Sequence, residues 1–216
     1  MFIETAERIA TPLQPASTEA ILEALEARGW CVLPDFIPGA DIGKLRRHAR
    51  GQLEADAFRP AGIGSGEAHA MNSGRRSDLI NWIDPQDAHL RRLCGARLEA
   101  LRLAINARLY LGLFDLESHF AVYPPGAFYE KHLDQFRHGG RRKLTIVLYL
   151  NREWTGDDGG QLLLYTNGDD DPQPVEVLPR GGTLVCFLSE QFPHEVLPSR
   201  RERLSLTGWF RTRESL

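Results

Sequence analysis

The sequence predicts an α+β fold, a double-stranded β-helix (jelly roll) core of about eight strands braced by N-terminal helices. Apolar residues recur mostly at helical spacing up to about residue 115, and beyond it they alternate with a period of two. Gly, Pro and Asp turn signals separate most of the alternating runs. We therefore expect a single domain over residues 1–216, with helical support over about 15–115 and the jelly-roll core over about 116–213.

The first part of the chain contains three amphipathic runs and two short apolar runs. Cap and turn residues bound them, and apolar positions three and four apart mark the helical ones. They predict helices over 17–29, 40–57 and 85–110 and strands over 30–33 and 78–83.

Segment 59–78 has a different composition, because glycines and small polar residues replace the apolar pattern. Glycines leave the backbone free and contribute nothing to a core. The strand that follows anchors one end of the segment. We predict that 59–78 is a lid over the functional site.

The second part of the chain shows eight short runs with the alternation of half-buried strands. They lie at 117–123, 127–134, 143–150, 161–165, 175–178, 183–188, 194–197 and 203–211. This number of short strands, with turn signals between them, is typical of a jelly roll.

Residues that could bind a metal ion or a carboxylate lie on three of these strands. His132 and Asp134 are two residues apart, so they project from the same face of a strand. His194 lies in a later strand and Arg203 in the last one. Two imidazoles and one carboxylate form the facial triad of non-haem Fe(II) oxygenases, which leaves coordination positions open.

The last two strands allow a check of register. A hairpin centred on 198–199 would place His194 opposite Arg203, and paired residues point to the same face. Alternation then puts Arg203, Ser205, Thr207 and Trp209 inside the barrel. A buried guanidinium needs a carboxylate, and these two strands supply none that is suitable, so we predict a ligand carboxylate.

Composition limits the partners and the compartment. The net charge of −3 argues against broad electrostatic binding to nucleic acid or to an anionic membrane. Cys31, Cys94 and Cys186 are scattered in apolar surroundings, which predicts buried free thiols in a reducing compartment. The charged start lacks the pattern of a signal peptide, and no run is long enough to span a membrane. We expect a cytoplasmic protein.

Short motifs occur in order between about Arg76 and Phe210. They are Arg76-x-Asp78-x-Ile80-x-Trp82-Ile83, Tyr123-Pro-Pro-Gly, His132-x-Asp134, Leu148-Tyr149-Leu150-Asn151, Gly159-Gly160-x-Leu162, Pro179-Arg180-x-Gly182-x-Leu184-Val185-x-Phe187, and Pro193-His194-Glu195-Val196 followed by Arg203, Thr207 and Trp209. Together they resemble the iron- and 2-oxoglutarate-dependent prolyl 4-hydroxylases, most closely the oxygen-sensing animal type and its bacterial relatives.

The resemblance implies a metal and a cosubstrate. His132, Asp134 and His194 would hold Fe(II) as the catalytic centre, and 2-oxoglutarate would chelate the iron. Its far carboxylate would pair with Arg203, helped by the hydroxyl of Tyr149, because a planar guanidinium suits a carboxylate. The cosubstrate pocket would be lined by Tyr123, Thr207 and Trp209.

The resemblance also implies a reaction and a substrate. Dioxygen and 2-oxoglutarate would be consumed, succinate and CO2 released, and ascorbate would serve as a reductant. The substrate would be a prolyl residue, hydroxylated at C4, in a cytosolic protein, with elongation factor Tu as a candidate. Arg76, Asp78 and Arg142 would face this substrate, although a structural salt bridge is the alternative for the first two.

Three other functions are compatible with these residues. The same chemistry could act on a free amino acid or a small metabolite. An oxygenase that repairs nucleic acid is a weaker alternative, because Trp209 stands where such enzymes carry a second arginine. A non-catalytic metal-binding jelly roll would bind metal without consuming 2-oxoglutarate. His119, His138 and the acidic turn Asp169–Asp171 receive no functional role.

Overall fold

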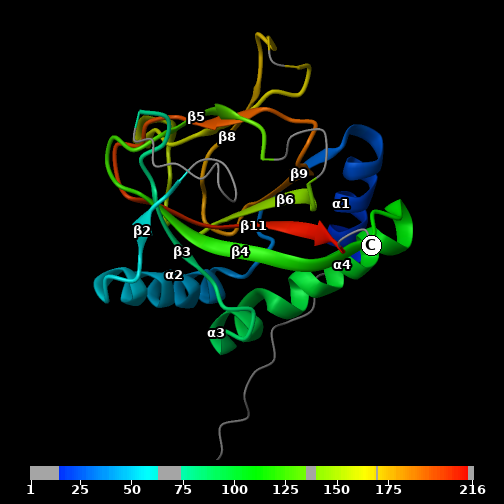
Figure 1. Ribbon diagram of the computed structural model, residues 1–216, viewed down its shortest axis with the longest axis horizontal. Coiled ribbons are helices and arrows are strands. Elements are labelled where there is room, and N and C mark those ends of the chain that lie inside the picture. The colour runs from blue at the N-terminus through cyan, green and yellow to red at the C-terminus, as the bar shows by residue number, and fades with distance from the viewer. Residues whose placement is uncertain (1–14, 63–73, 135–139, 169, 214–216) are drawn as a thin grey trace, which may run out of the picture.

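The computed structural model contains two antiparallel β-sheets with helices outside the larger one (Figure 1). It describes residues 15–62, 74–134, 140–168 and 170–213. The strands are β1 (Trp30–Leu33), β2 (Arg59–Pro60), β3 (Leu79–Trp82), β4 (Leu113–Tyr123), β5 (Tyr129–His132), β6 (Arg142–Tyr149), β7 (Leu162–Leu164), β8 (Val175–Val177), β9 (Leu184–Leu188), β10 (His194–Val196) and β11 (Arg203–Thr212).

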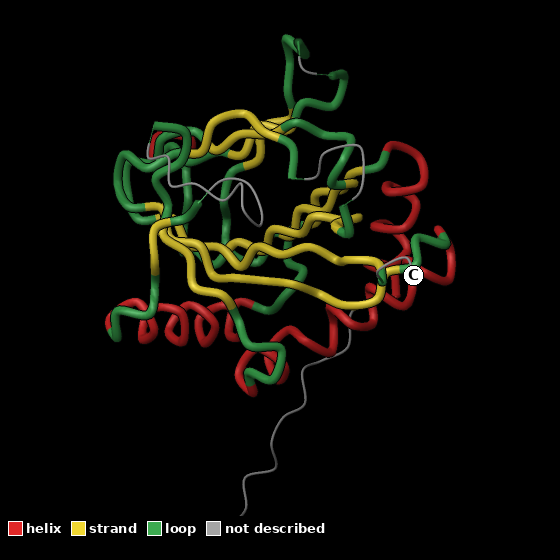
Figure 2. The backbone as a smooth tube through the Cα atoms, in the orientation of Figure 1, coloured by secondary structure: helices red, strands yellow, loops and turns green. Residues whose placement is uncertain are grey.

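The two sheets form the two walls of the predicted jelly roll. The larger sheet has the strand order β1-β9-β6-β11-β4-β3-β2, and the smaller has the order β5-β10-β7-β8. They appear as separate layers of strands in Figure 2. The fold class predicted from the sequence is confirmed, and each of the eight runs expected after residue 115 forms a strand. The single-domain assignment stays a prediction.

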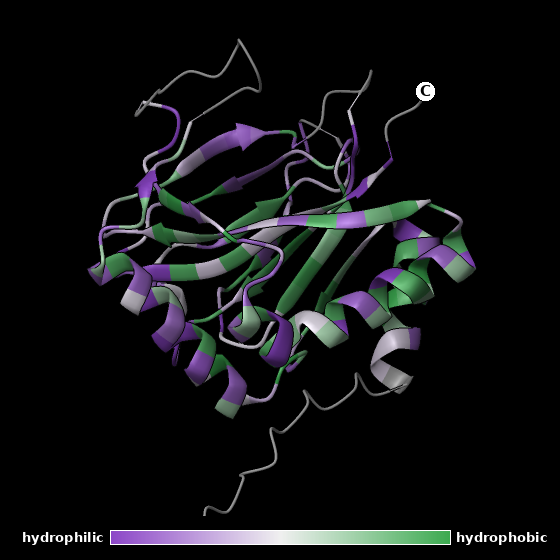
Figure 3. Cartoon of the chain, turned by 60° about the horizontal axis from the view of Figure 1, so that its bottom comes forward, coloured by the Kyte–Doolittle hydropathy of each residue, from purple (hydrophilic) through white to green (hydrophobic). Residues whose placement is uncertain are grey.

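The helices follow the predicted amphipathic runs. They are α1 (Pro15–Arg28), α2 (Gly39–Glu54), α3 (Ala88–Leu90), the π-helical turn η2 (Arg91–Gly95) and α4 (Ala96–Leu109), with a 3-10 turn η3 (Gly156–Asp158) in a later loop. In α2, Ile42, Leu45 and Ala49 are buried at helical spacing. Hydrophilic and hydrophobic residues alternate along these helices (Figure 3).

The helix predicted over 85–110 contains a π-helical turn near its start, directly after α3. Asp87 caps its start by accepting a hydrogen bond from the backbone N–H of Leu90 at 2.9 Å. Leu93 and Leu98 are five positions apart, yet both are buried. A π turn closes its hydrogen bonds five residues apart, so it accommodates this spacing and keeps both leucines on the core side.

Two hydrophobic cores lie on either side of the larger sheet. The first packs the helices against its outer face, where Leu204, Leu206 and Phe210 of β11 point as predicted. The second fills the space between the sheets and includes Tyr149 and Phe187. Because side chains alternate along β11, the residues between those leucines face the second core, and this places the polar site between the two sheets.

The predicted hairpin between His194 and Arg203 is wrong. β10 belongs to the smaller sheet, where His194 pairs with His132 and Leu164, whereas Arg203 in the larger sheet pairs with Tyr123. The chain crosses between sheets over 197–202. Its backbone bonds there go to loops, with Ser199 N–H donating to Ala127 and Arg200 N–H to Asp158, so no two-stranded turn forms.

Two further findings concern the cysteines and the hydropathy of the helices. Cys31, Cys94 and Cys186 are buried and free, as the sequence predicts. None of the described helices is long and apolar enough to cross a membrane.

Candidate active site

His132, Asp134 and His194 converge at one end of the smaller sheet. One ligand atom of each lies within 4.8 Å of the others. Asp134 Oδ1 is 3.5 Å from His132 Nε2, and its Oδ2 is 3.6 Å from His194 Nε2. β5 ends at His132, so Asp134 lies in the bend after the strand rather than in it as predicted. Two imidazole nitrogens and a carboxylate fit Fe(II) with positions left open.

Backbone carbonyls orient both imidazoles. His132 Nδ1 lies 2.7 Å from the Glu130 carbonyl oxygen, and His194 Nδ1 lies 3.1 Å from that of Phe192. A carbonyl oxygen can only accept, so in the neutral rings Nδ1 carries the proton. The Nε2 lone pairs are therefore free and turned toward Asp134, as in a metal ligand whose other nitrogen is held by a hydrogen bond.

The protonation states also suit a metal. Burial opposes ionisation of Asp134, but His194 and His132 hold the pKa of this carboxyl well below its ordinary value. Burial and the neighbouring His132 lower the pKa of His194 to about 4. At neutral pH the carboxylate is thus charged and His194 neutral, which is the form that binds a metal ion. The hydroxyl of Thr145 donates to Asp134 Oδ2 at 2.7 Å.

Arg203 lies between the sheets as a buried cation. Its side chain is among the largest that are fully buried, and its guanidinium carbon is 4.7 Å from the ring centroid of Tyr123 and 5.0 Å from that of Tyr149. Arg203 Nε and the Tyr149 hydroxyl are buried without a hydrogen-bond partner. A buried charge without a counter-ion is costly. These orphaned donors fit the carboxylate of a bound ligand.

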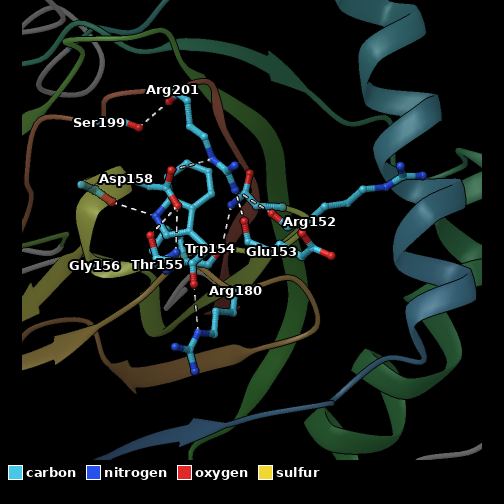
Figure 4. A network of polar contacts seen from close by, with 12 residues as sticks. Arg152, Glu153, Trp154, Thr155, Gly156, Asp158, Arg180, Ser199 and Arg201 are labelled. Atoms are coloured by element: carbon cyan, nitrogen blue, oxygen red, sulfur yellow. Dashed lines mark hydrogen bonds and ion pairs between the residues drawn. The ribbon is translucent and has the colours of Figure 1, made fainter.

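A network of polar contacts surrounds Trp154 in the loop that precedes Gly160 (Figure 4). Trp154 donates its indole N–H to a carbonyl of its own loop at 2.8 Å, and the Arg201 guanidinium lies over the Trp154 ring. Arg201 also pairs with Asp158 at 3.3 Å. Gly160 has a φ of +68°, and a Cβ there would come within 3.0 Å of Arg203 Cδ. Glycine therefore lets this loop lie against the arginine.

Comparison with known proteins assigns this geometry to a family. Residues 118–211 match the sequence profile of the 2OG-Fe(II) oxygenase superfamily, where 2OG is 2-oxoglutarate. The chain is 43% identical to a Pseudomonas putida prolyl-4-hydroxylase, whose crystal structure it matches with a TM-score of 0.81 over 91% of this chain and 100% of that one. The chain belongs to the 2OG-Fe(II) oxygenase superfamily. The resemblance stated from the sequence is confirmed.

Two further relatives are also prolyl hydroxylases. The hypoxia-inducible factor prolyl hydroxylase of Caenorhabditis elegans is 30% identical over 89% of this chain, and the chain spans 28% of that protein's length. The fold matches a prolyl hydroxylase of Trichoplax adhaerens, in complex with a hypoxia inducible factor peptide fragment, with a TM-score of 0.80 at 24% identity over 90% of this chain and 88% of that one. This 2OG-Fe(II) oxygenase is thus similar to prolyl hydroxylases.

The residues predicted to face the substrate differ in accessibility. The guanidinium carbon of Arg142 lies 3.5 Å from the centroid of the Trp209 ring. Arg142 also forms an ion pair with Glu117 at 2.8 Å, and 31% of its side chain is exposed. Arg76 instead binds both oxygens of Asp78, at 2.8 and 2.7 Å. The Asp78 side chain has no exposed surface. Arg142 is the one of the three that remains open to a substrate, and their substrate roles stay predictions.

The other predicted site residues lie around the metal cluster or outside the described residues. Thr207 and Trp209 are on the inner face of β11, and the Trp209 indole N–H is buried without a partner. Residues 63–73 of the predicted lid, and His138, lie outside the described residues. In the acidic turn, Asp171 accepts backbone N–H groups and so has a local structural role.

Two residues near the metal site are absent from the sequence-based prediction. Thr145, which binds Asp134, lies four residues before Tyr149 in β6 and therefore on the same inner face, so alternation alone could have found it. Tyr129 stacks on His132 although the two residues are three positions apart in the strand. An odd spacing points to opposite faces in a regular strand, so the sequence contains no signal for this contact.

The burial of His119 should make the free energy of unfolding depend on pH. It is buried against Trp82 and Trp209, and burial lowers its pKa to about 3. An unfolded histidine titrates near pH 6.5, so the unfolded state binds more protons below that pH and stability falls toward pH 3. Between pH 7 and pH 5, His119 should lower the free energy of unfolding of the native chain by about 2 kcal/mol. We expect His119→Met to lack this decrease.

Urea unfolding of the metal-free protein at the two pH values measures this difference. His89→Met, at an exposed histidine, is the control for the general effect of replacing an imidazole with a methionine side chain. An identical pH dependence in His119→Met and the native chain would show that His119 is not buried in the neutral form.

Proposed function

We propose that this oxygenase hydroxylates C4 of a prolyl residue in a cytoplasmic protein, with elongation factor Tu as the candidate substrate. The observation that carries the proposal is the 43% identity with a prolyl-4-hydroxylase over that enzyme's whole length. The nematode relative is named for a protein substrate, and the Trichoplax enzyme is in complex with a peptide. Both names favour a proline within a polypeptide over a free amino acid.

One set of residues would bind the metal ion and another would bind the cosubstrate. His132, Asp134 and His194 would hold Fe(II), and Arg203 with the Tyr149 hydroxyl would bind the far carboxylate of 2-oxoglutarate. When bound, iron and cosubstrate supply the oxidation of a C–H bond by dioxygen, with succinate and CO2 as coproducts and ascorbate as a reductant. Tyr123, Thr207 and Trp209 would line the cosubstrate between the sheets and keep water from this chemistry.

Arg142 would orient the substrate at the entrance. It is partly exposed, lies over Trp209, and belongs to the same strand as Thr145, which binds Asp134. A guanidinium at this place can donate to the backbone carbonyls of a peptide. The proline ring would then reach the metal cluster past Trp209.

Mass spectrometry of elongation factor Tu tests the substrate. After incubation with the enzyme, Fe(II), 2-oxoglutarate and ascorbate, one peptide should gain the mass of one oxygen atom on a proline. Replacement of that proline with alanine should abolish the gain. If the protein stays unmodified while a free amino acid or metabolite drives succinate formation, the substrate is a small molecule and the proposal fails.

A further inference from the structure

The strand that carries His132 is short and has little support from its own sheet. β5 has four residues and lies at the edge of the smaller sheet, with β10 as its only partner strand there. Its other edge is bound by residues 75–77. Glu130 N–H donates to the Arg75 carbonyl at 2.8 Å, and Ser77 N–H donates to that of Phe128 at 3.1 Å. The segment before β3 therefore helps to hold a metal ligand in place.

An irregular pairing brings Tyr129 against His132. His194 and Val196 are two residues apart on β10, but they pair with His132 and Tyr129, which are three apart on β5. Such a bulge shifts the alternation by one residue, so two side chains of odd spacing can share a face. The Tyr129 and His132 rings stack with centroids 3.5 Å apart and an interplanar angle of 15°.

Arg76 occupies the other face of the Tyr129 ring. Its guanidinium carbon lies 4.1 Å from the Tyr129 centroid, and two groups so close to one centroid cannot share a face. The guanidinium is itself held by both oxygens of Asp78 and by the Gly62 carbonyl at 3.0 Å. Arg76, Tyr129 and His132 thus form a column that begins in a buried ion pair and ends at the metal site.

We propose that Tyr129 and Arg76 are positioning residues that fix the plane of the His132 imidazole for metal binding; this inference rests on the metal site of the proposed function. The Glu130 carbonyl holds one edge of the ring, yet a single hydrogen bond leaves rotation about the Cβ–Cγ bond soft. The Tyr129 ring restrains that rotation. His194 also contacts an aromatic ring, that of Phe187, edge-on with ring centroids 4.7 Å apart.

This arrangement assigns Arg76 and Asp78 to the metal side of the site. Asp78 has no exposed side-chain surface and Arg76 only 12%, so they contact His132 through Tyr129 more directly than they could contact a substrate. Loss of the column should therefore weaken metal binding in the absence of any substrate. A residue that only binds substrate would change the KM for the protein and leave metal affinity unchanged.

Titration of the metal-free enzyme with Mn(II), followed by the EPR signal of the free ion, tests the column. Tyr129→Leu should weaken binding by roughly 10- to 100-fold, the usual effect of losing a residue that supports a ligand. Tyr129→Phe retains the stacked ring and should bind as the native chain does. Circular dichroism of each variant shows whether the fold is intact. An unchanged Mn(II) affinity in folded Tyr129→Leu would overturn the proposal.

The other end of the column provides a second test if Tyr129→Leu does not fold. The double variant Arg76→Gln with Asp78→Asn removes both buried charges together, so no unpaired carboxylate remains. It should also weaken Mn(II) binding. Arg75→Met is the matched control, since Arg75 forms an exposed ion pair with Glu130 on the same strand without contacting the ring. Equal affinities in the double variant and Arg75→Met would contradict the column.

The titration contains no prolyl substrate, so it separates this inference from the proposed function. Native enzyme that binds Mn(II) and shows the predicted variant effects, but does not modify a proline, would leave the column intact and refute the substrate. Prolyl hydroxylation together with an Mn(II) affinity that does not depend on Tyr129 would support the substrate and refute the column.

Discussion

Alanine at His132, Asp134 or His194 is expected to reduce 2-oxoglutarate-dependent succinate formation to the background of free iron. Each residue supplies one of three converging ligand atoms, all within 4.8 Å of one another. Two remaining ligands hold a divalent ion too weakly, and they leave the cosubstrate without its orientation.

The fold should survive these substitutions, because His132 ends β5, Asp134 lies in the adjoining bend and His194 begins β10, and none of the three belongs to the hydrophobic cores. Thermal unfolding of the metal-free variants checks this, and succinate formation measures the chemistry. Thr145→Val is a graded comparison. It removes the hydroxyl that binds Asp134 and Ser189 but none of the three metal ligands, so it should retain part of the activity. Full turnover in any one alanine variant would remove that residue from the metal site.

Arg203→Met is expected to raise the 2-oxoglutarate requirement strongly while leaving the fold at least as stable. Loss of a charge-assisted partner for a carboxylate in a shielded pocket costs about 2–5 kcal/mol of binding, which is more than tenfold in affinity. In the metal-free protein the guanidinium is buried, with its Nε unpaired. Its replacement by an apolar side chain of similar length removes a desolvation cost.

The two measurements separate binding from stability. Succinate formation at varied 2-oxoglutarate gives the cosubstrate requirement, and urea unfolding gives the free energy of unfolding. Tyr149→Phe removes one hydroxyl from the same pocket and should have a smaller effect on the requirement. An unchanged requirement in Arg203→Met would refute the assignment of Arg203 to the cosubstrate.

The sequence predicts the strands well, because turn residues mark their ends. The two faces of a strand also have different surroundings, so the side chains alternate in type along it. The run at 30–33 is a strand over those same residues, and the alternation at 203–211 correctly sends Leu204, Leu206 and Phe210 to the helix side. Tertiary pairing is less local. The residues between His194 and Arg203 have the composition of a hairpin turn, but their partners are loops distant in the sequence, and the hairpin prediction fails.

In the candidate site too, some features follow from the local sequence and others depend on contacts between distant segments. The triad and Arg203 could be predicted, because each follows from residue type and the order of motifs. The contact of Tyr129 with His132 depends on a bulge, and a bulge depends on how β5 pairs with β10. The buried pair of Arg76 and Asp78 depends likewise on the packing of 75–78 against β5, which no local pattern reveals.

The central claim is that this chain couples 2-oxoglutarate oxidation to hydroxylation of a prolyl residue. Turnover of elongation factor Tu under isotopically heavy dioxygen tests it most directly, with mass spectrometry of both products. We expect one heavy oxygen atom in succinate and one in the modified proline, in equal amounts, and neither product in His194→Ala. Heavy succinate formed without any modified proline, at the same rate with and without the protein, would contradict it.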